Sequence, residues 1–292
     1  MGKSLAAVHL ARRFHGEIVS CDSIQVYRGF DIGTAKPPPE LRQAVPHHLV
    51  DVAEPHCQFT AADFVRQALK AIRTIDQRHH LPIIVGGTGL YFKALLSGLF
   101  PGPGRDDSLR EKLHLRIKAD GLESLWRELH EVDPTYARLI GCRDKVRIIR
   151  ALEVFYLTQK PLSAHFRATR SPLRGFHPLK IGLKLEREEL YRRIEARVEK
   201  MFEGGLVEEV RSLLARGVRE TAPPFRALGY KHVLRHLRGE ISLDEAVSLT
   251  KKDTRHYAKR QMTWFRKMEG IRWFEADDLR SLEEYLEVEL AA

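Results

Sequence analysis

Residues 81–89 read Leu81-Pro82-Ile83-Ile84-Val85-Gly86-Gly87-Thr88-Gly89. The apolar run is typical of a strand buried in a parallel sheet, and the glycines predict a turn into a helix that follows. A second strand is predicted at residues 17–20, ending in Cys21-Asp22-Ser23. Because strand, turn and helix follow one another, the sequence predicts an α/β fold.

Further elements extend this pattern on both sides. Thr60 and Asp63 form a capping pair for a helix whose buried side contains apolar residues at helical spacing. Strands are predicted again at residues 180–185 and 271–274, and long helices at residues 188–216 and 242–268.

The run Pro101-Gly102-Pro103-Gly104 marks a boundary. Beyond it the pattern is helical, with Ser108 and Glu111 as a capping box and no strand candidate before residue 180. Residues 167–178 are polar and interrupted by proline and glycine. We therefore expect a core formed by residues 1–103 and 180–292, with an all-helical insertion at residues 104–179.

Composition excludes several classes of protein. The chain has 292 residues, 43% apolar and 30% charged, which excludes disorder for most of its length. No apolar run is long enough for a membrane span, and the N-terminus lacks an export signal, so we expect a cytoplasmic protein without a membrane partner. The three cysteines lie outside CxxC spacing, and the adjacent pairs His47-His48 and His79-His80 do not predict a metal site.

The charge favours a polyanionic partner. Lysine and arginine outnumber aspartate and glutamate by 49 to 39, a formal net charge of +10. Residues 251–270 contain seven basic and two acidic residues, with Tyr257, Trp264 and Phe265 between them. We expect the basic side of this helix to face RNA and the aromatic side chains to belong to the core. On charge alone, an ordinary basic enzyme remains an equal alternative.

Two short segments are candidates for phosphate chemistry. Gly2-Lys3-Ser4 before a helix is the second half of the loop GxxxxGK[ST], in which backbone amides and lysine bind phosphate and serine binds Mg²⁺. It is also an ordinary helix start. Ligands of α/β sheets bind at the carboxyl ends of the strands, so Asp22 and residues 86–89 are expected near Lys3 and Ser4. Asp22 is a candidate Mg²⁺ partner, a general base or a turn cap.

Residues 22–37 identify a family. They read Asp22-Ser23-Ile24-Gln25-Val26-Tyr27-Arg28-Gly29-Phe30-Asp31-Ile32-Gly33-Thr34-Ala35-Lys36-Pro37, and this string resembles the bacterial tRNA dimethylallyltransferase (tRNA isopentenyltransferase) family. The resemblance extends over nearly the whole chain, through Pro46-His47-His48-Leu49, residues 59–64, 85–95 and 147–154, Ala227-Leu228-Gly229-Tyr230 and residues 259–266.

The resemblance implies a reaction and a fold. The enzyme would transfer a dimethylallyl group from dimethylallyl diphosphate to N6 of the adenosine next to the anticodon in tRNA, releasing diphosphate. Its core would be of the phosphate-loop nucleoside-kinase type with a parallel sheet, and the helical insertion would clamp the anticodon stem-loop. Diphosphate would be bound by Gly2, Lys3, Ser4 and Arg226, with Ser4 on Mg²⁺, and Asp22 would be the general base.

The resemblance also implies an RNA-binding set, and the chain is expected to act as a monomer. The residues that match tRNA-contacting positions of the family are Asp22, Ser23, Ile24, Gln25, Thr88, Arg110, Val146, Arg147, Ile148, Ile149 and Arg150. Arg147 and Arg150 lie three residues apart, on one side of a helix, where they would bind phosphates or form an ordinary solvated surface.

Two other functions remain open. A small-molecule kinase, or a transferase that prenylates a free adenine nucleotide, would share the phosphate site, but it needs neither a helical insertion nor a basic C-terminal helix. A non-catalytic tRNA-binding protein would retain the basic surfaces without a complete phosphate loop. Competition between tRNA and AMP as acceptors distinguishes the first, and tRNA binding without product distinguishes the second.

The chain differs from the family pattern at its start. Family members begin with an apolar strand and a loop similar to GxTxSGKS, and here nothing precedes Met1. We expect that strand to lie beside residues 17–20, the 292-residue chain to be unstable or inactive, and the functional protein to begin upstream of Met1.

Extending the chain tests this expectation. Adding a family-type strand and loop before Gly2 should raise the rate of prenyl transfer to tRNA above that of the 292-residue chain, because it supplies phosphate-binding amides. Full activity of the shorter form in the same assay would contradict it.

Overall fold

The computed structural model describes residues 2–166 and 169–291, so Arg167 and Ala168, in the segment predicted to be irregular, lie outside the described residues. The chain divides into two compact units. The core unit comprises Met1–Leu95 and Gly175–Ala292, and the helical unit comprises Leu96–Arg174. The sequence pattern had placed these boundaries at residues 103/104 and 179/180.

The core unit contains two parallel sheets. Strands β1 (Gly16–Cys21), β2 (His47–His48) and β3 (Leu81–Gly86) form the first, in the order β2-β1-β3, while β4 (Lys180–Lys184) pairs with β5 (Ile271–Glu275) in the second. Parallel pairing is as predicted. The sequence did not predict that the strands divide into two separate sheets.

The central position of β1 corrects one expectation. Its residues pair with β3 from Gly16↔Leu81 to Cys21↔Gly86 and with β2 at Ile18↔His47. Both edges of β1 are therefore occupied, and the expectation that a preceding strand would lie beside residues 17–20 is wrong. A two-residue strand such as β2 has no hydrophobic pattern, so the sequence did not reveal it.

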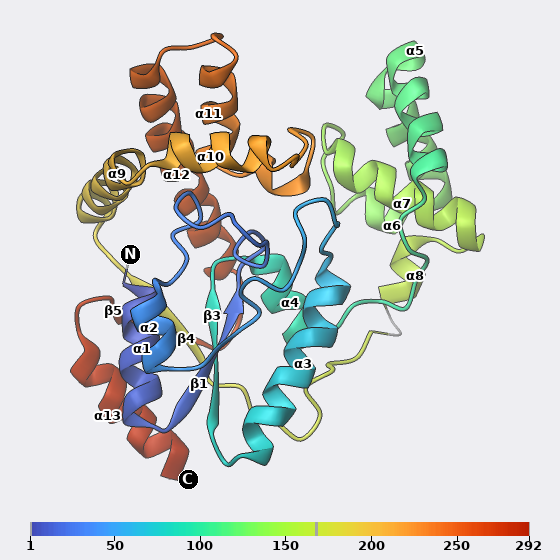
Figure 1. Ribbon diagram of the computed structural model, residues 1–292. Coiled ribbons are helices and arrows are strands. Elements are labelled where there is room, and N and C mark those ends of the chain that lie inside the picture. The colour runs from blue at the N-terminus through green and yellow to red at the C-terminus, as the bar shows by residue number, and fades with distance from the viewer. Residues whose placement is uncertain (1, 167–168, 292) are drawn as a thin grey trace. The chain divides into compact units, whose positions relative to one another are not determined.

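Helices cover the first sheet because their apolar sides match it. Helix α1 (Lys3–Arg13) packs Ala7, Val8 and Ala11 against Ile18, and lies beside α13 (Leu279–Ala291) (Figure 1). Helix α3 (Ala61–Gln77) begins with the predicted capping box, in which Thr60 and Asp63 each accept a hydrogen bond from the other's backbone N–H. The remaining elements before residue 98 are α2 (Pro39–Ala44) and α4 (Gly89–Ser97).

The C-terminal part of the core unit is mainly helical. Its elements are α9 (Arg187–Glu203), α10 (Leu206–Ala215), the 3₁₀ helix η1 (Pro223–Arg226), α11 (Tyr230–Leu237) and α12 (Leu243–Phe265). The predicted single helix over residues 188–216 is in fact two helices. The break lies at Gly204 and Gly205, and Gly205 has φ of +93°, a conformation that ends a right-handed helix.

The helical unit contains α5 (Asp107–Val132), α6 (Pro134–Ala137), α7 (Lys145–Thr158) and α8 (Leu162–Phe166) around its own apolar core. Helix α5 is capped by Asp106, whose Oδ1 accepts a hydrogen bond from Leu109 N at 2.8 Å. The capping box predicted at Ser108 and Glu111 is therefore wrong, because an earlier carboxylate caps the helix. No helix within residues 2–166 and 169–291 is long and apolar enough to cross a bilayer.

A buried carboxylate stabilises the amino end of β1. Glu17 is 2% exposed and accepts hydrogen bonds from His48 Nε2 at 2.7 Å, His80 Nδ1 at 2.8 Å and Arg78 Nη2 at 2.7 Å. Burial by itself raises the pKa of Glu17, but the hydrogen bonds from His48 and His80 and the charge of Arg78 outweigh it, so the pKa is lowered.

Replacing this carboxylate should destabilise the core unit in a pH-dependent way. Because the folded-state pKa of Glu17 is depressed, its stabilisation is present above the unfolded-state pKa and is lost as pH falls through the folded-state value. We expect Glu17→Gln to lower the free energy of unfolding by about 1–3 kcal/mol at pH 7, and by progressively less in acid. Urea unfolding across this pH range measures it.

The matched control is Glu284→Gln. Glu284 forms an exposed pair with Arg280 four residues earlier in α13, and such pairs contribute only about 0.3–0.5 kcal/mol. Equal effects of the two substitutions at every pH would contradict the role of Glu17.

Candidate active site

The site is built where β1 and β3 end together. Cys21 pairs with Gly86, and a Cβ added at Gly86 would lie 2.0 Å from the carbonyl oxygen of Cys21. Only glycine permits this approach. Immediately beyond it, Thr88 N donates to the carbonyl oxygen of Cys21 at 3.3 Å, so the segments that follow the two strands remain in contact.

Asp22 and Thr88 meet at this edge. Asp22 Oδ1 accepts hydrogen bonds from the backbone N–H groups of Ile24 at 2.8 Å and Gln25 at 3.2 Å. Ser23 N donates to Thr88 Oγ1 at 3.1 Å. One oxygen of Asp22 is thus the predicted turn cap, while Oδ2 accepts no hydrogen bond from the described part of the chain. The cap fixes the carboxylate and leaves one oxygen for chemistry.

Lys3 lies close enough to Asp22 for their charges to interact. Burial is the largest influence on the Lys3 ammonium and lowers its pKa; the Arg197 guanidinium lowers it further, and Asp22 raises it. Lys3 is the first residue of α1, after Gly2 with φ of +78°, and Ser4 beside it is exposed. The structure therefore brings together Asp22 and the Gly2-Lys3-Ser4 helix start.

Helix α12 forms the neighbouring wall. Gln261 Nε2 donates to the carbonyl oxygen of Gly87 at 2.7 Å, and the Trp264 ring lies where a Cβ on Gly89 would be. The half-buried Tyr257 lies beside Thr88 and Gln261; burial raises its pKa, and so does the nearby charge of Asp22. The prediction that Trp264 belongs to the core is wrong, because it is 43% exposed.

Tyr257 and Gln261 were missed as site residues. Gln261 lies in the matched string at residues 259–266, which carried the family resemblance but no assignment of roles. Tyr257, four residues earlier, is one helical turn away on the same side of α12. This spacing of four residues from Gln261 was the sequence signal that could have identified Tyr257 as a site residue.

The segment that follows Asp22 is held by its own side chains. Gln25 Nε2 donates to the carbonyl oxygens of Thr34 at 3.2 Å and Ala35 at 3.3 Å, and Gln25 Oε1 accepts from Ser20 Oγ at 3.1 Å. Gln25, predicted to contact tRNA, therefore uses its amide within the protein. Lys36 Nζ is held by the carbonyl oxygen of Tyr27 and by two carboxylates, Asp31 and Asp51.

A second anchor joins this segment to α10 and α11. Glu209 Oε2 accepts from the backbone N–H groups of Asp31 at 3.0 Å and Ile32 at 2.7 Å, and Glu209 Oε1 accepts from Tyr230 Oη at 2.5 Å. The Tyr230 ring lies 2.6 Å from the position of a Cβ on Gly33, so no side chain fits there. Glu209 had no sequence signal, because its partners are distant in the chain.

The predicted phosphate ligand Arg226 is not part of this cluster. It is exposed at the end of η1, and within the described residues it forms no polar contact with Lys3, Ser4 or Asp22. Its contact with diphosphate remains a prediction.

The helical unit uses two of the predicted RNA-binding arginines internally. Glu153 is fully buried and accepts from Arg110 Nε at 2.8 Å, Arg110 Nη2 at 2.9 Å, Arg150 Nη1 at 2.6 Å and Asp106 N at 2.9 Å. Burial raises the pKa of Glu153, but the hydrogen bonds from Arg110 and Arg150 reverse that effect and set it to about 2.

The stretch from Val146 to Arg150 divides into exposed and buried residues. Val146 is 75% exposed and the Arg147 side chain is 55% exposed, whereas Ile148 and Ile149 belong to the apolar core of the helical unit. Only the exposed side chains are available to RNA, and RNA contact by this stretch remains a prediction.

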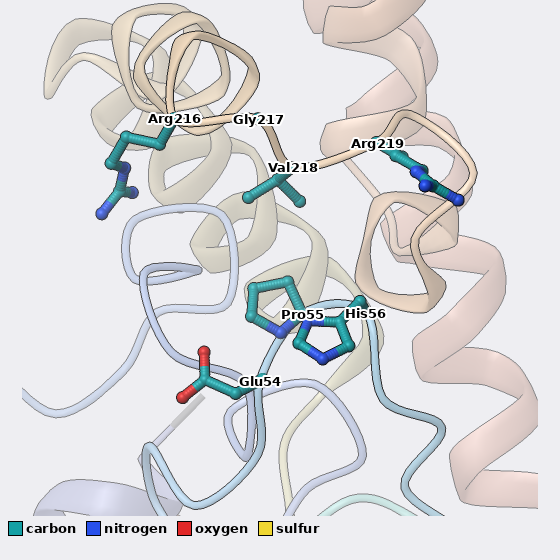
Figure 2. A pocket seen from close by; sticks show the side chains of 7 residues that line it. All are labelled: Glu54, Pro55, His56, Arg216, Gly217, Val218 and Arg219. Atoms are coloured by element: carbon teal, nitrogen blue, oxygen red, sulfur yellow. The ribbon is translucent and has the colours of Figure 1, made fainter.

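A cavity of about 620 Å³ lies elsewhere in the core unit. It is lined by Glu54, Pro55, His56, Arg216, Gly217, Val218 and Arg219. Figure 2 shows the side chains of Arg216 and Arg219 pointing away from each other. The cavity shares no residue with the predicted site, and its two arginine side chains do not point toward a common position.

Comparison with known proteins places this geometry in a family. The sequence model described as IPP transferase matches residues 25–268. The chain is 53% identical to a tRNA dimethylallyltransferase of Geobacter metallireducens over 274 residues, which cover 94% of this chain and 89% of the relative.

Solved structures agree with the sequence comparison. The full-length tRNA isopentenylpyrophosphate transferase of Bacillus halodurans matches with a TM-score of 0.73 and 37% identity, covering 99% of this chain and 93% of that one. A eukaryotic dimethylallyltransferase that acts on tRNA matches with a TM-score of 0.81 and 28% identity, covering 99% and 76%.

The close approach at Gly86 gives a testable prediction. Gly86→Ala should lower the free energy of unfolding by about 3 kcal/mol or more, because the new Cβ meets the backbone of Cys21. Gly87→Ala is the matched control, since its Cβ meets only the amide end of Gln261, which can move. Urea unfolding of the two variants compares them, and an equal loss of stability would contradict this account of the strand ends.

Proposed function

The chain belongs to the IPP transferase family, and we propose that it transfers a dimethylallyl group from dimethylallyl diphosphate to N6 of the adenosine next to the anticodon in tRNA. The observation that carries the proposal is the position of Asp22 beside Lys3. A fixed carboxylate and a half-buried cation near it supply what a nucleophilic amine and a leaving diphosphate need.

The reaction exchanges one bond for another. The bond between C1 of the dimethylallyl group and the diphosphate oxygen breaks, and its electron pair stays on the departing diphosphate. N6 of the adenine forms a bond to C1 and releases a proton, which Asp22 Oδ2 accepts. An adenine amine is barely basic, so we expect proton transfer to accompany bond formation and not to precede it.

The start of α1 supplies the donor side. Gly2 and Lys3 would bind the diphosphate, and Arg226, which lies outside this cluster, would have to extend its exposed side chain to reach the same phosphates. Ser4 is exposed, and its hydroxyl suits a Mg²⁺ ion taking most of its ligands from phosphate and water. When bound, this ion would neutralise diphosphate charge.

The acceptor side is the turn after β1 together with Thr88. A base in an anticodon loop must leave its stack to reach a pocket, where polar groups and aromatic rings receive it. Asp22, Ser23, Ile24, Gln25 and Thr88 line this side, and Tyr257 stands next to Thr88. In the helical unit, the exposed Val146 and Arg147 would contact the anticodon stem-loop, and Arg110 and Arg150, predicted for the same role, would hold the helix that presents them through Glu153.

The alternatives predict different products. A transferase acting on free adenine nucleotide would prenylate AMP in competition with tRNA, and a non-catalytic protein would bind tRNA without forming product. The match to tRNA dimethylallyltransferases over 94% of the chain favours transfer to tRNA.

Asp22→Asn tests the general base. Asparagine keeps the oxygen that caps Ile24 and Gln25 but cannot take a proton, so we expect kcat to fall roughly 100- to 10,000-fold while tRNA affinity is retained. Steady-state transfer of labelled dimethylallyl groups and tRNA filter binding measure the two quantities, in the 292-residue chain and in its extended form.

Asp76→Asn is the control for loss of a carboxylate, because Asp76 is an exposed residue of α3. It should leave both measurements unchanged. An Asp22→Asn variant with the parent kcat would overturn the assignment of Asp22, and tRNA binding without product from either parent form would favour the non-catalytic alternative.

A further inference from the structure

The side chain of Lys36 is a buried cation with three partners. It is only 3% exposed, and Nζ donates to the carbonyl oxygen of Tyr27 at 2.6 Å, to Asp31 Oδ1 at 2.7 Å and to Asp51 Oδ1 at 2.5 Å. An ammonium has three N–H donors, so all of them are used within the protein. Lys36 is therefore not free to bind a substrate, and the groups that compensate its charge tie together three points of the chain.

The first effect of these contacts is to close the loop between Tyr27 and Lys36. Lys36 N also donates to the carbonyl oxygen of Asp31 at 3.1 Å, so the end of the loop is bound through its main chain and its side chain. Ala35, immediately before Lys36, has φ of +49°, a left-handed conformation that is unfavourable for a residue with a Cβ. Such a conformation persists only where neighbouring interactions compensate it. The contacts of Lys36, together with the hydrogen bond from Gln25 Nε2 to the carbonyl oxygen of Ala35 at 3.3 Å, supply that compensation.

The second effect extends through Asp51 to the turn that carries Asp22. Asp51 N donates to the carbonyl oxygen of Gln25 at 3.2 Å, and Gln25 N donates to Asp22 Oδ1 at 3.2 Å. Gln25 is thus held through its N–H by Asp22 and through its carbonyl oxygen by Asp51. Asp51 Oδ2 also accepts from Arg42 Nη1 at 2.8 Å. Burial raises the pKa of Asp51, but the hydrogen bonds and charges of Lys36 and Arg42 outweigh it and lower the pKa, so this carboxylate stays ionised at neutral pH.

We propose that Lys36 is a positioning residue for Asp22. Through Asp51 and Gln25 it fixes the orientation of the carboxylate that is the proposed general base. This inference rests on the proposed function, in which Asp22 Oδ2 accepts the proton of N6. Without the ammonium, the Asp51 carboxylate and the carbonyl oxygen of Tyr27 each lose a donor, and the turn after Asp22 is less restrained. A displacement of about 1 Å at a reacting group can lower a rate roughly 100-fold.

Lys36→Met tests this role, because it removes the ammonium and keeps an unbranched side chain. In the 292-residue chain and in its extended form, the single-turnover rate constant of dimethylallyl transfer should fall roughly 10- to 100-fold. Affinity for tRNA by filter binding should be nearly unchanged, since Lys36 contacts no substrate. With enzyme in excess, this rate constant does not depend on the fraction of chains that is folded, so a loss of stability alone leaves it unchanged.

The decisive measurement repeats the substitution in Asp22→Asn. The base is already absent in that variant, so Lys36→Met should lower the remaining rate constant by less than about twofold. A residue that supports the site in some other way would instead lower both rate constants by the same factor.

Lys70→Met is the matched control, because Lys70 is an exposed lysine of α3, and it should keep the parent rate constant. Thermal melting reports folding. Should Lys36→Met fail to fold, Asp51→Asn takes its place, since asparagine keeps an oxygen that accepts from Lys36 and loses the charge. It should lower the rate constant of the parent but not that of Asp22→Asn.

Two results would overturn the positioning role and leave the proposed function intact. These are a parent-like rate constant in the folded variant, and an equal proportional loss with and without the Asp22 carboxylate. Absence of transfer by both the 292-residue chain and its extended form would instead reject the proposed function.

Discussion

The approach of β1 to β3 at Cys21 and Gly86 is the constraint on which the site depends. No side chain fits between the two backbones, and Cys21 and Gly86, the last residues of the two strands, lie opposite each other. Asp22 and Thr88, which follow the strands, therefore enter the same space. The hydrogen bond from Thr88 N to Cys21 and the contact of Ser23 N with Thr88 Oγ1 continue this closeness beyond the sheet. The general base that we propose at Asp22 needs a fixed position, and here the backbone supplies it.

A partly buried hydrogen-bond network holds the segment after Asp22 from the other side. Glu209 accepts hydrogen bonds from two backbone N–H groups of this segment and from the hydroxyl of Tyr230, so its carboxylate is satisfied without a basic partner among the described residues. Gly33 then allows the Tyr230 ring to close against the backbone. Stability and positioning are therefore linked, since the interactions that bury Tyr230 also restrain the turn that carries Asp22.

The parts of this architecture that could be predicted are those encoded locally. The strand at residues 81–86 has an apolar run and is followed by a glycine turn, and the capping residues Thr60 and Asp63 are only three positions apart. The strand and the helix start could therefore be predicted from the sequence. The short strand β2 and the split between α9 and α10 left little or no such signal. The partners of Glu209 depend on contacts between distant segments, and no local pattern reports those.

The ion pairs of the helical unit rank its arginines as RNA ligands. Arg150 donates to Glu153 and to the carbonyl oxygens of Pro103 and Gly104, so most of its donors are already used, and Arg110 gives two donors to the same carboxylate. Among the described residues, Arg147 forms an ion pair only with Asp144 at the start of α7, and more than half of its side chain is exposed. A phosphate of the RNA backbone can replace Asp144 at low cost, because exposed pairs contribute little stability. Of the arginines proposed to bind RNA, we therefore expect Arg147 to make the direct contact, while Arg110 and Arg150 fix the helix that presents it.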